Sequence, residues 1–220
     1  MTTETPEERS GRWLSILERV QAEIIQIHHH REIWDFLNTH LGEQPDSAVV
    51  HEALARWYVS SQGAAVRRIY EPKDKRSFGN LLKSLEAHAN ELTRERFLSL
   101  WEQRSEPGGD EHGMFHAMAN ETFDGFSGPG ETHVNAAIVA VDREKLRTAA
   151  HNVARWVDEN VAHIGRTHSV TVTYGELDSA ITLVGDLLKR YYLLLTAKSL
   201  MTVTPMIQEP WQTPSTKPWI

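Results

Sequence analysis

The residues best suited to chemistry lie at the end of a long apolar-periodic stretch, in the segment 154–163. This segment places Arg155, Asp158 and His163 where two helices should meet. A histidine titrates near neutrality, so His163 can take or donate a proton, as RNA cleavage requires. Such chemistry also needs a cation that offsets the charge developing on the phosphate. The structural alternative is a histidine at a helix C-terminus, where the helix dipole favours its proton and its ring packs on a neighbouring helix.

A second set of candidates is the densest basic run of the chain, which follows a predicted helix. Its basic residues are Arg67, Arg68, Lys73, Lys75 and Arg76. Cationic side chains bind RNA phosphates, so the run is a candidate RNA-binding patch. The alternative is structural, because the helix dipole also favours basic residues near a helix C-terminus.

The 12 histidines raise the further alternative of a metal site. Three of them are consecutive, at 28–30, and successive helical residues differ by about 100°, so these three cannot share one face. Additional ligands from other positions would be Glu23, His51 or His88. DinB-like helical bundles bind a divalent metal through scattered histidines of this kind. The pair His112 and His116 lacks the glutamate of a zincin motif and is interpreted as part of a solvated loop. Because no ligand-spacing motif is present, we expect no metal or other cofactor.

Helical periodicity and helix-start signals predict the elements that position these residues. Capping boxes mark the first and last helices, at 5–8 and 173–176, and Ser77 and Thr93 are caps of two others. Arg31 lies within the apolar stripe of the first helix, which makes it a candidate buried or interface charge. The predicted helices cover residues 6–41, 47–70, 78–89, 93–101, 114–123, 134–162 and 174–197.

The composition narrows the class of protein. Hydrophobic residues make up 40% and charged residues 24%, as in ordinary soluble globular proteins. The absence of cysteine excludes disulfides, a thiol nucleophile and cysteine-ligated metals. No apolar run is long enough for a membrane span and no signal peptide is recognisable, so we expect a cytoplasmic protein. The net charge of −7 confines any RNA contact to a local basic patch.

The C-terminal half has a characteristic order: a long helix, Asp158-x-x-x-x-His163, a short loop, a capped final helix and Tyr191-Tyr192. This order resembles the HEPN superfamily of small helical domains found in abortive-infection and toxin–antitoxin systems. More narrowly, it resembles the group named after the phage-resistance protein AbiU2. Similar features at 53–83 extend the resemblance over most of the chain, with 105–130 as an insertion.

The superfamily motif is an arginine, usually followed by a polar residue, and a histidine a few residues later. The resemblance implies that His163 acts as acid/base and that Asp158 is its polar partner. Val157 stands at the position of the motif arginine, so the phosphate-stabilising cation would be Arg155 or Arg166. Arg155 lies about 12 Å and roughly 80° of helix from His163, which is poor placement within one subunit. Active members pair these residues across a homodimer and cleave RNA without metal.

The sequence therefore predicts an all-α protein: a single up-and-down bundle of five to seven helices over 1–200, with a partly ordered insertion at about 105–130. An extended tail containing proline and tryptophan follows at 201–220. The expected function is a HEPN-like homodimer, with RNA as substrate and an antitoxin or other protein as partner. The alternatives are a catalytically degenerate binding or dimerisation module, in which His163 is structural, and a metal-binding bundle.

Overall fold

The computed structural model describes residues 4–42, 47–103, 112–162 and 170–203 of the 220-residue chain. These ranges contain seven α-helices and no β-strand, which confirms the predicted all-α class. The helices are α1 (Pro6–Gly42), α2 (Ala48–Tyr70), α3 (Phe78–Ala87), α4 (Arg94–Glu102), α5 (His112–Ser127), α6 (Ala136–Asn160) and α7 (Tyr174–Thr196). A short 3-10 turn, Ala89–Glu91, lies between α3 and α4.

Side-chain caps begin the helices where the sequence predicts. The backbone N–H of Glu8 donates to Thr5 Oγ1 at 3.2 Å, and the N–H of Thr5 donates to Glu8 Oε2 at 2.8 Å. The same reciprocal box forms at 173–176, at the start of α7. Ser77 and Thr93 each accept a hydrogen bond from the backbone N–H three residues later. Each cap satisfies a backbone donor that the helix itself leaves unpaired.

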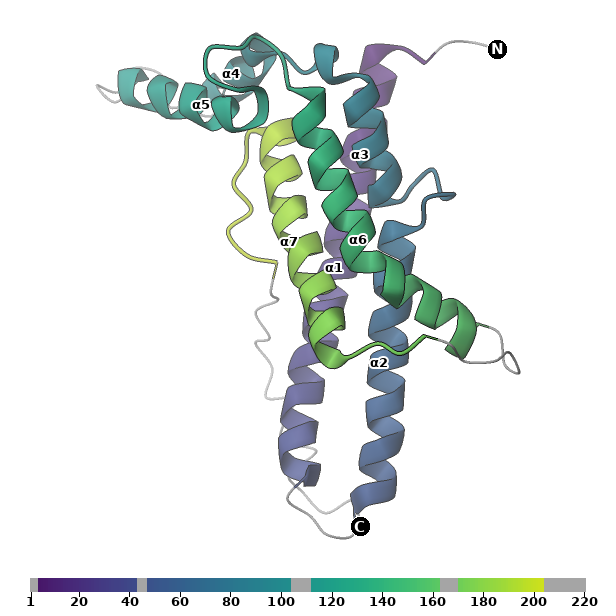
Figure 1. The fold of residues 1–220 in the computed structure, drawn as a ribbon. Helices are drawn as coiled ribbons and strands as arrows, with labels where there is room; N and C mark the ends of the chain where they lie inside the picture. The colour runs from purple at the N-terminus through teal and green to yellow at the C-terminus, as the bar shows by residue number, and fades with distance from the viewer. Residues whose placement is uncertain (1–3, 43–46, 104–111, 163–169, 204–220) are drawn as a thin grey trace.

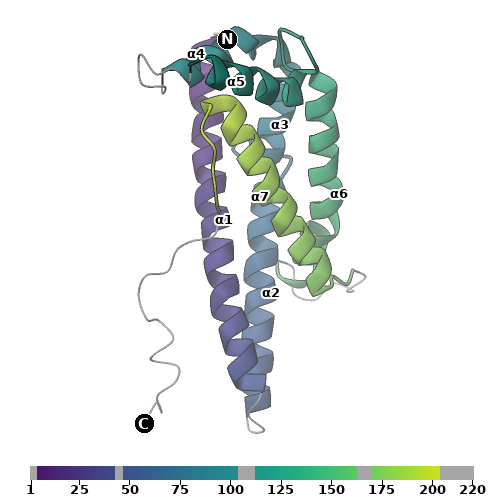
Figure 2. The same cartoon turned by 90° about the vertical axis from the view of Figure 1, so that its left-hand side faces the viewer.

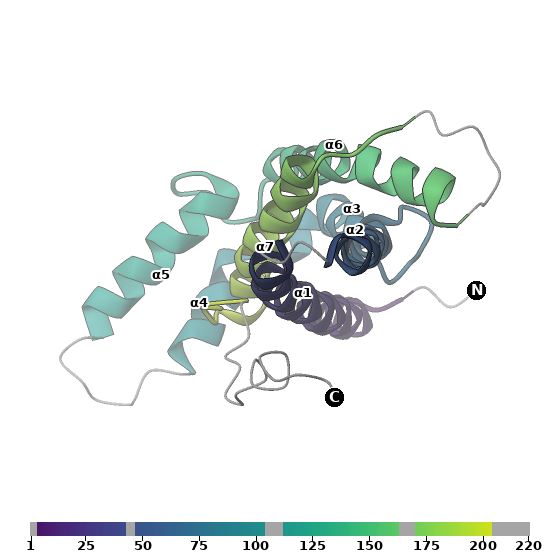
Figure 3. The ribbon, with the colours of Figure 1, turned by 90° about the horizontal axis from the view of Figure 1, so that it is seen from below.

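Four long rods form the bundle: α1, then α2 continued by α3, then α6, then α7 (Figures 1 and 2). Successive rods run in opposite directions, which confirms the predicted up-and-down arrangement. α6 contacts both α2 and α3, and α7 contacts α6 and α1, which closes the bundle. Seen along the rods, α6 and α7 lie on one side of the α1–α2 pair, and α4 and α5 extend to the side (Figure 3).

One hydrophobic cluster fills the bundle and receives side chains from all seven helices. Its buried members extend down to Ile27 on α1 and to Ala65 on α2, and the half-buried Val59 packs against it farther down α2. Trp34 and Tyr58 lie farther down and are buried, but they are not part of this cluster. The lower ends of α1 and α2 therefore pack mainly on each other.

A buried carboxylate links α6 to α7 within the core. Tyr191 Oη donates to Asp142 Oδ2 at 3.2 Å, and Arg190 Nε lies 3.2 Å from the same oxygen. Lys145 Nζ lies 3.1 Å from the other oxygen, Asp142 Oδ1. Burial, and then the Asp142 charge, raise the pKa of Tyr191 well above its ordinary value. The buried charge is thus matched by cations and a hydroxyl, as burial of a carboxylate requires.

The region expected to be an insertion contains a longer helix than the predicted 114–123. α5 extends to Ser127, and Phe123 and Phe126 are buried in the main cluster. Their ring centroids lie 5.6 and 6.5 Å from that of Phe97 on α4. α5 is therefore part of the core, because its apolar side chains complete the layer that α4 begins.

A glycine turn and one arginine fix α5 against α4. Gly128 and Gly130 have φ values of 99° and 74°, a left-handed conformation that glycine adopts without strain. Arg94 donates to the carbonyl oxygens of Asn120 at 3.1 Å and Glu131 at 2.9 Å, and it also pairs with Asp124. These bonds hold α5 and the glycine turn against the start of α4.

After α7 the chain turns back along that helix. A Cβ on Gly185 would lie 3.4 Å from Val203 Cγ2, so Val203 packs closely on the middle of α7. Most of the predicted tail, from 204 to 220, lies outside the described residues. Among the helices of the described ranges, none combines the length and the apolar character needed to cross a lipid bilayer.

Candidate functional site

The end of α6, which carries two of the predicted catalytic residues, crosses α2 at Gly63. A Cβ on Gly63 would lie 3.0 Å from Val157 Cγ2 and 3.3 Å from Trp156 Cζ3. The missing side chain lets the two helices approach closely. The crossing therefore holds the end of α6 at one place on α2, and the side chains around it form a defined junction.

Asp158 joins this junction through an arginine of the predicted RNA-binding run. Arg67 Nε lies 2.7 Å from Asp158 Oδ1, and Arg67 Nη2 lies 3.4 Å from Glu71 Oε2. The Nε–H of Arg67 makes no hydrogen bond, so the contact with Asp158 is an ion pair without an aligned hydrogen bond. The structure thus brings together residues from two sets that the sequence presented separately.

Arg155 lies on the same stretch of α6 but pairs elsewhere. Its Nη2 is 3.4 Å from Glu159 Oε1, one helical turn farther on. The other carboxylate oxygen of Glu159 accepts a hydrogen bond from Val170 N at 3.2 Å. Glu159 therefore ties the returning chain to α6. The predicted catalytic residues His163 and Arg166 lie between Glu159 and Val170 in the sequence. They belong to the segment 163–169, which is outside the described residues.

The other arginines of the basic run also face carboxylates. Arg68 pairs with Glu23 of α1, and Arg76 Nε lies 3.8 Å from Asp74 Oδ1. The exposed side chains of Lys73 and Lys75 form no ion pair with any described residue. The predicted patch is therefore partly neutralised at its arginines, and its unpaired positive charge comes from the two lysines.

Sequence reasoning missed Arg19, which belongs to the same surface. It lies 3.4 Å from Asp74 Oδ2 and lines a shallow depression together with Arg68 and Arg76. Arg19 and Glu23 are four residues apart and share one face of α1. That spacing was the available signal, but it could not show which helix the face meets.

A second group of titratable side chains lies where α7 begins, over α1 and α2. Arg31, whose position in the apolar stripe suggested a buried or interface charge, forms an ion pair with Asp178 of α7. Burial raises the pKa of Asp35 and raises that of Tyr58 to about 12. Burial, and then nearby cations, lower the pKa of His28. At neutral pH the group thus contains the Arg31–Asp178 ion pair, the carboxyl of Asp35, a protonated tyrosine and a neutral histidine.

Within the described ranges, the histidines do not converge on a point where they could bind a metal ion together. His30 packs on Trp57, and His51 stacks on Trp34 and lies 2.7 Å from Asn38 Oδ1. Among described residues, no group of three or more His, Asp or Glu side chains is placed to hold a metal ion.

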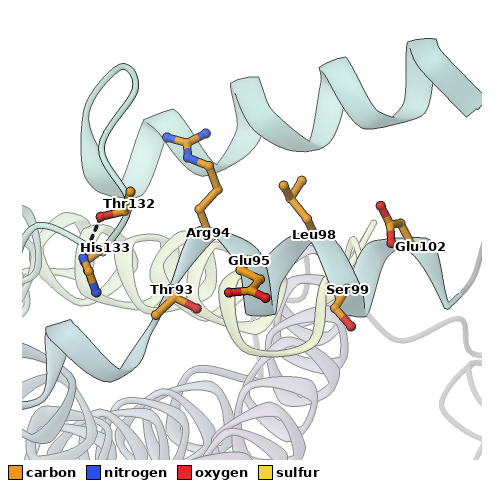
Figure 4. A pocket seen from close by; sticks show the side chains of 8 residues that line it. All are labelled: Thr93, Arg94, Glu95, Leu98, Ser99, Glu102, Thr132 and His133. Atoms are coloured by element: carbon orange, nitrogen blue, oxygen red, sulfur yellow. Dashed lines mark hydrogen bonds between the residues drawn. The ribbon is translucent and has the colours of Figure 1, made fainter.

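A cleft of about 620 Å³ lies along α4 (Figure 4). Its lining residues are Thr93, Arg94, Glu95, Leu98, Ser99, Glu102, Thr132 and His133. Thr132 Oγ1 lies 2.8 Å from His133 Nδ1, but no carboxylate of the described chain hydrogen-bonds to this imidazole. Arg94, the cation of the cleft, is fully engaged with α5 and the glycine turn. Among the described residues, the cleft therefore lacks the oriented base that nucleophilic catalysis requires.

Comparisons of the chain with protein families, with characterised proteins and with solved structures found no match.

Proposed function

We propose that this chain is a HEPN-like helical protein that acts on RNA at the α2–α6 junction, as a homodimer and without a metal ion. The observation that carries the proposal is the 2.7 Å contact between Arg67 Nε and Asp158 Oδ1. This contact places a cation of the predicted RNA-binding run beside the predicted catalytic segment. It supports the proposal because Val157 cannot supply the cation that the motif arginine provides, and Arg67 can.

In this proposal each side chain has a separate task. His163 transfers the proton during cleavage of the RNA backbone, and Asp158 holds the arginine in position. Arg67, with Arg155 or Arg166, stabilises the phosphate charge that develops in the transition state. The resemblance places such a protein in phage defence or a toxin–antitoxin system, where an antitoxin is the expected partner.

The test compares RNA cleavage by the wild type and by His163→Ala, both purified and kept in EDTA, on transfer RNA and on a single-stranded RNA. We expect cleavage by the wild type and its loss in the variant. Arg67→Gln should reduce the cleavage rate, whereas Arg147→Gln should not. Arg147 is a matched control, because it also lies on the bundle surface in an ion pair with a glutamate, Glu144. The proposal is wrong if the folded wild type does not cut these RNAs, or if His163→Ala cuts them equally well.

A non-catalytic binding module is the second candidate, and one observation favours it. The described charges at the end of α6 are already matched, Arg155 by Glu159 and Asp158 by Arg67. A surface whose ion pairs are complete has less to gain from binding a phosphate. In that case the wild type would neither cut RNA nor bind it in a way that depends on Arg67, and the helices would make protein contacts instead.

A further inference from the structure

An exposed apolar stripe lies on the lower part of α2, where α1 and α2 extend beyond the rest of the bundle (Figures 1 and 2). It consists of Val50, Ala53, Leu54 and Trp57, whose spacing puts them on one helical face. Val50 is 55% exposed and Trp57 is 50% exposed. α6 crosses α2 at Gly63, about 120° around the helix from Trp57, so the described helices leave this face open. A stripe of exposed apolar side chains over two helical turns indicates a contact surface.

The upper end of the stripe is aromatic. His30 of α1 packs on Trp57, with ring centroids 5.7 Å apart. Behind them, the buried rings of Trp34 and Tyr58 stack with centroids 5.2 Å apart. Proline-rich segments dock on aromatic surfaces of this kind, because their extended conformation is already formed and little entropy is lost. The surface therefore suits an extended segment that contains proline and aromatic residues.

The chain itself directs a further segment toward this end of the bundle. Ala197 has a φ of 49°, a left-handed conformation that turns the chain back at the end of α7. Residues 198–203 then return along α7 (Figure 2). A Cβ on Gly185 would lie 3.4 Å from Val203 Cγ2, so the return is closely packed where the described chain ends. Residues 204–220 therefore start beside the middle of α7, from a chain that is heading for the lower end of α1 and α2.

Residues 204–220, which we call the tail, have a composition that matches the stripe. The tail contains two Pro-Trp pairs, Pro210-Trp211 and Pro218-Trp219, and two further prolines. Prolines at this spacing are incompatible with a helix and favour an extended chain. One glutamate and one lysine are its only charged side chains, so the tail has no net side-chain charge. An apolar surface can therefore accept it without burying an excess of either sign.

We propose that the tail passes around α1 and docks on the stripe as an extended segment, with Pro218-Trp219 against the rings of Trp57 and His30. The lower ends of α1 and α2 then have a second layer of apolar contacts in addition to the one between the two helices. Such a layer stabilises this end of the bundle, because two helices with a single layer of side chains between them are only marginally stable in water.

The position of Trp57 relative to α7 follows from two contacts. Asp178 is seven residues before Gly185, or about 10 Å lower along α7. It pairs with Arg31, whose neighbour His30 packs on Trp57. Trp57 therefore lies about 10 Å below the end of the described chain along the rods and two interhelical spacings, about 20 Å, across them. The route around α1 is thus about 30 Å long.

This length decides which Pro-Trp pair can reach the stripe. An extended proline-rich chain advances about 3.1 Å per residue, so Trp211 is at most about 25 Å from Val203, and Trp219 at most about 50 Å. The first pair is too close to α7, whereas the second reaches the stripe with several residues to spare.

The small size of the stripe favours an occupant from the same chain. The stripe spans about 10 Å of helix, much less than a specific interface between separate proteins covers. A tethered segment meets its surface at an effective concentration on the order of millimolar, so a weak contact is sufficient. This face lies away from the α2–α6 junction and its occupant is tested without RNA, so the inference does not depend on the proposed function.

The first test uses the absence of native cysteine. In the full chain, Ala53→Cys combined with Lys217→Cys should form a disulfide within one molecule on mild oxidation at low protein concentration. Val141→Cys with Lys217→Cys is the matched control, because Val141 is also 55% exposed but lies on α6. Non-reducing electrophoresis and peptide mass mapping measure the rate and the linkage. Equal rates for the two pairs, or linkage only between two molecules, would overturn the proposal.

The second test measures amide hydrogen exchange in residues 48–62 of the full chain. Trp219→Ala should speed this exchange about tenfold, because the hairpin of α1 and α2 loses its apolar cover. Trp211→Ala is the control: it removes the same side chain from a part of the tail that is too short to reach the stripe, and it should leave the exchange unchanged. The core helix α3 serves as the internal reference for folding. Unchanged exchange in Trp219→Ala, or an equal effect of Trp211→Ala, would show that the docking as proposed is wrong.

Discussion

Removing the two charges of the Arg67–Asp158 pair separately gives opposite expectations for RNA binding. Asp158→Asn removes one of the two carboxylates that face the Arg67 guanidinium and leaves only Glu71, so RNA affinity should rise. Arg67→Gln removes the phosphate-binding group itself, so affinity should fall. If the pair were only structural, the two substitutions would not shift RNA affinity in opposite directions.

The structure sets the size of both effects. The two side chains are 35% and 46% exposed, so the pair is worth about 0.2–1 kcal/mol, as measured for solvent-exposed ion pairs. Releasing it should therefore raise RNA affinity about 1.4- to 5-fold at most. Loss of one phosphate contact should reduce the slope of log K against log salt by about 0.7 for single-stranded RNA. Neither substitution should lower the free energy of unfolding by more than about 1 kcal/mol.

The assay is fluorescence anisotropy of a labelled single-stranded RNA in EDTA over a series of salt concentrations. All variants carry His163→Ala, so that the RNA remains intact. Glu144→Gln and Arg147→Gln serve as controls, because this ion pair lies on α6 before the junction, and they should leave affinity and salt slope unchanged. Equal weakening by Asp158→Asn and Arg67→Gln would refute the reasoning, since both would then act through the fold of the junction. An unchanged salt slope in Arg67→Gln would remove Arg67 from the RNA site.

Three further predictions concern the framework. Asp142→Ala should destabilise the protein by about 2–4 kcal/mol, because it leaves Tyr191 Oη and Arg190 Nε without their partner in the core. Tyr191→Phe should cost only about 1 kcal/mol. Equal losses of unfolding free energy for the two variants in urea would contradict this. Thr173→Ala removes the cap of α7 and should cost about 1 kcal/mol in the same assay, and an unchanged midpoint would mean that the cap is not formed. The pKa of His28 is lowered in the folded state, by burial first, so the unfolded chain binds its proton more strongly. Its contribution is therefore full above about pH 6.5 and is lost as pH falls below that value. His28→Gln should make the loss of stability shallower as pH falls below about 6.5, and an unchanged pH dependence would refute this assignment.

The helix starts could be predicted because each depends on a few neighbouring residues. A hydroxyl that accepts from a backbone N–H three positions later is a local interaction, and it occurs at Ser77, at Thr93 and in the boxes at 5–8 and 173–176. α6 begins at Ala136, two residues after the predicted start at 134, because the side chain of Asn135 accepts a hydrogen bond from the backbone N–H of Ala137 and caps the helix there. Local chemistry therefore determined the all-α class and the positions of most helices.

The extent of α5 was not predictable by the same means. Glycine and proline surround it on both sides, and such composition is typical of loops. Its helix is held by contacts distant in sequence: Phe123 against Phe97, and Arg94 against Asp124. How far a helix between glycines extends depends on what it packs against, which the pattern of residues does not contain.

The same division applies to the candidate site. The sequence alone identified Arg31 as an unusual charge, Asp158 as the polar partner in a family-like motif, and 67–76 as a basic run. Only the tertiary structure decided that Arg31 pairs with Asp178 and that Arg67 reaches Asp158 across the α2–α6 crossing. It also decided that Val50 and Trp57 of α2 are about half exposed, because helical periodicity does not distinguish a covered face from an open one. Helix formation depends on neighbours along the chain, whereas ion pairs between helices and exposed faces depend on how the rods are arranged in space.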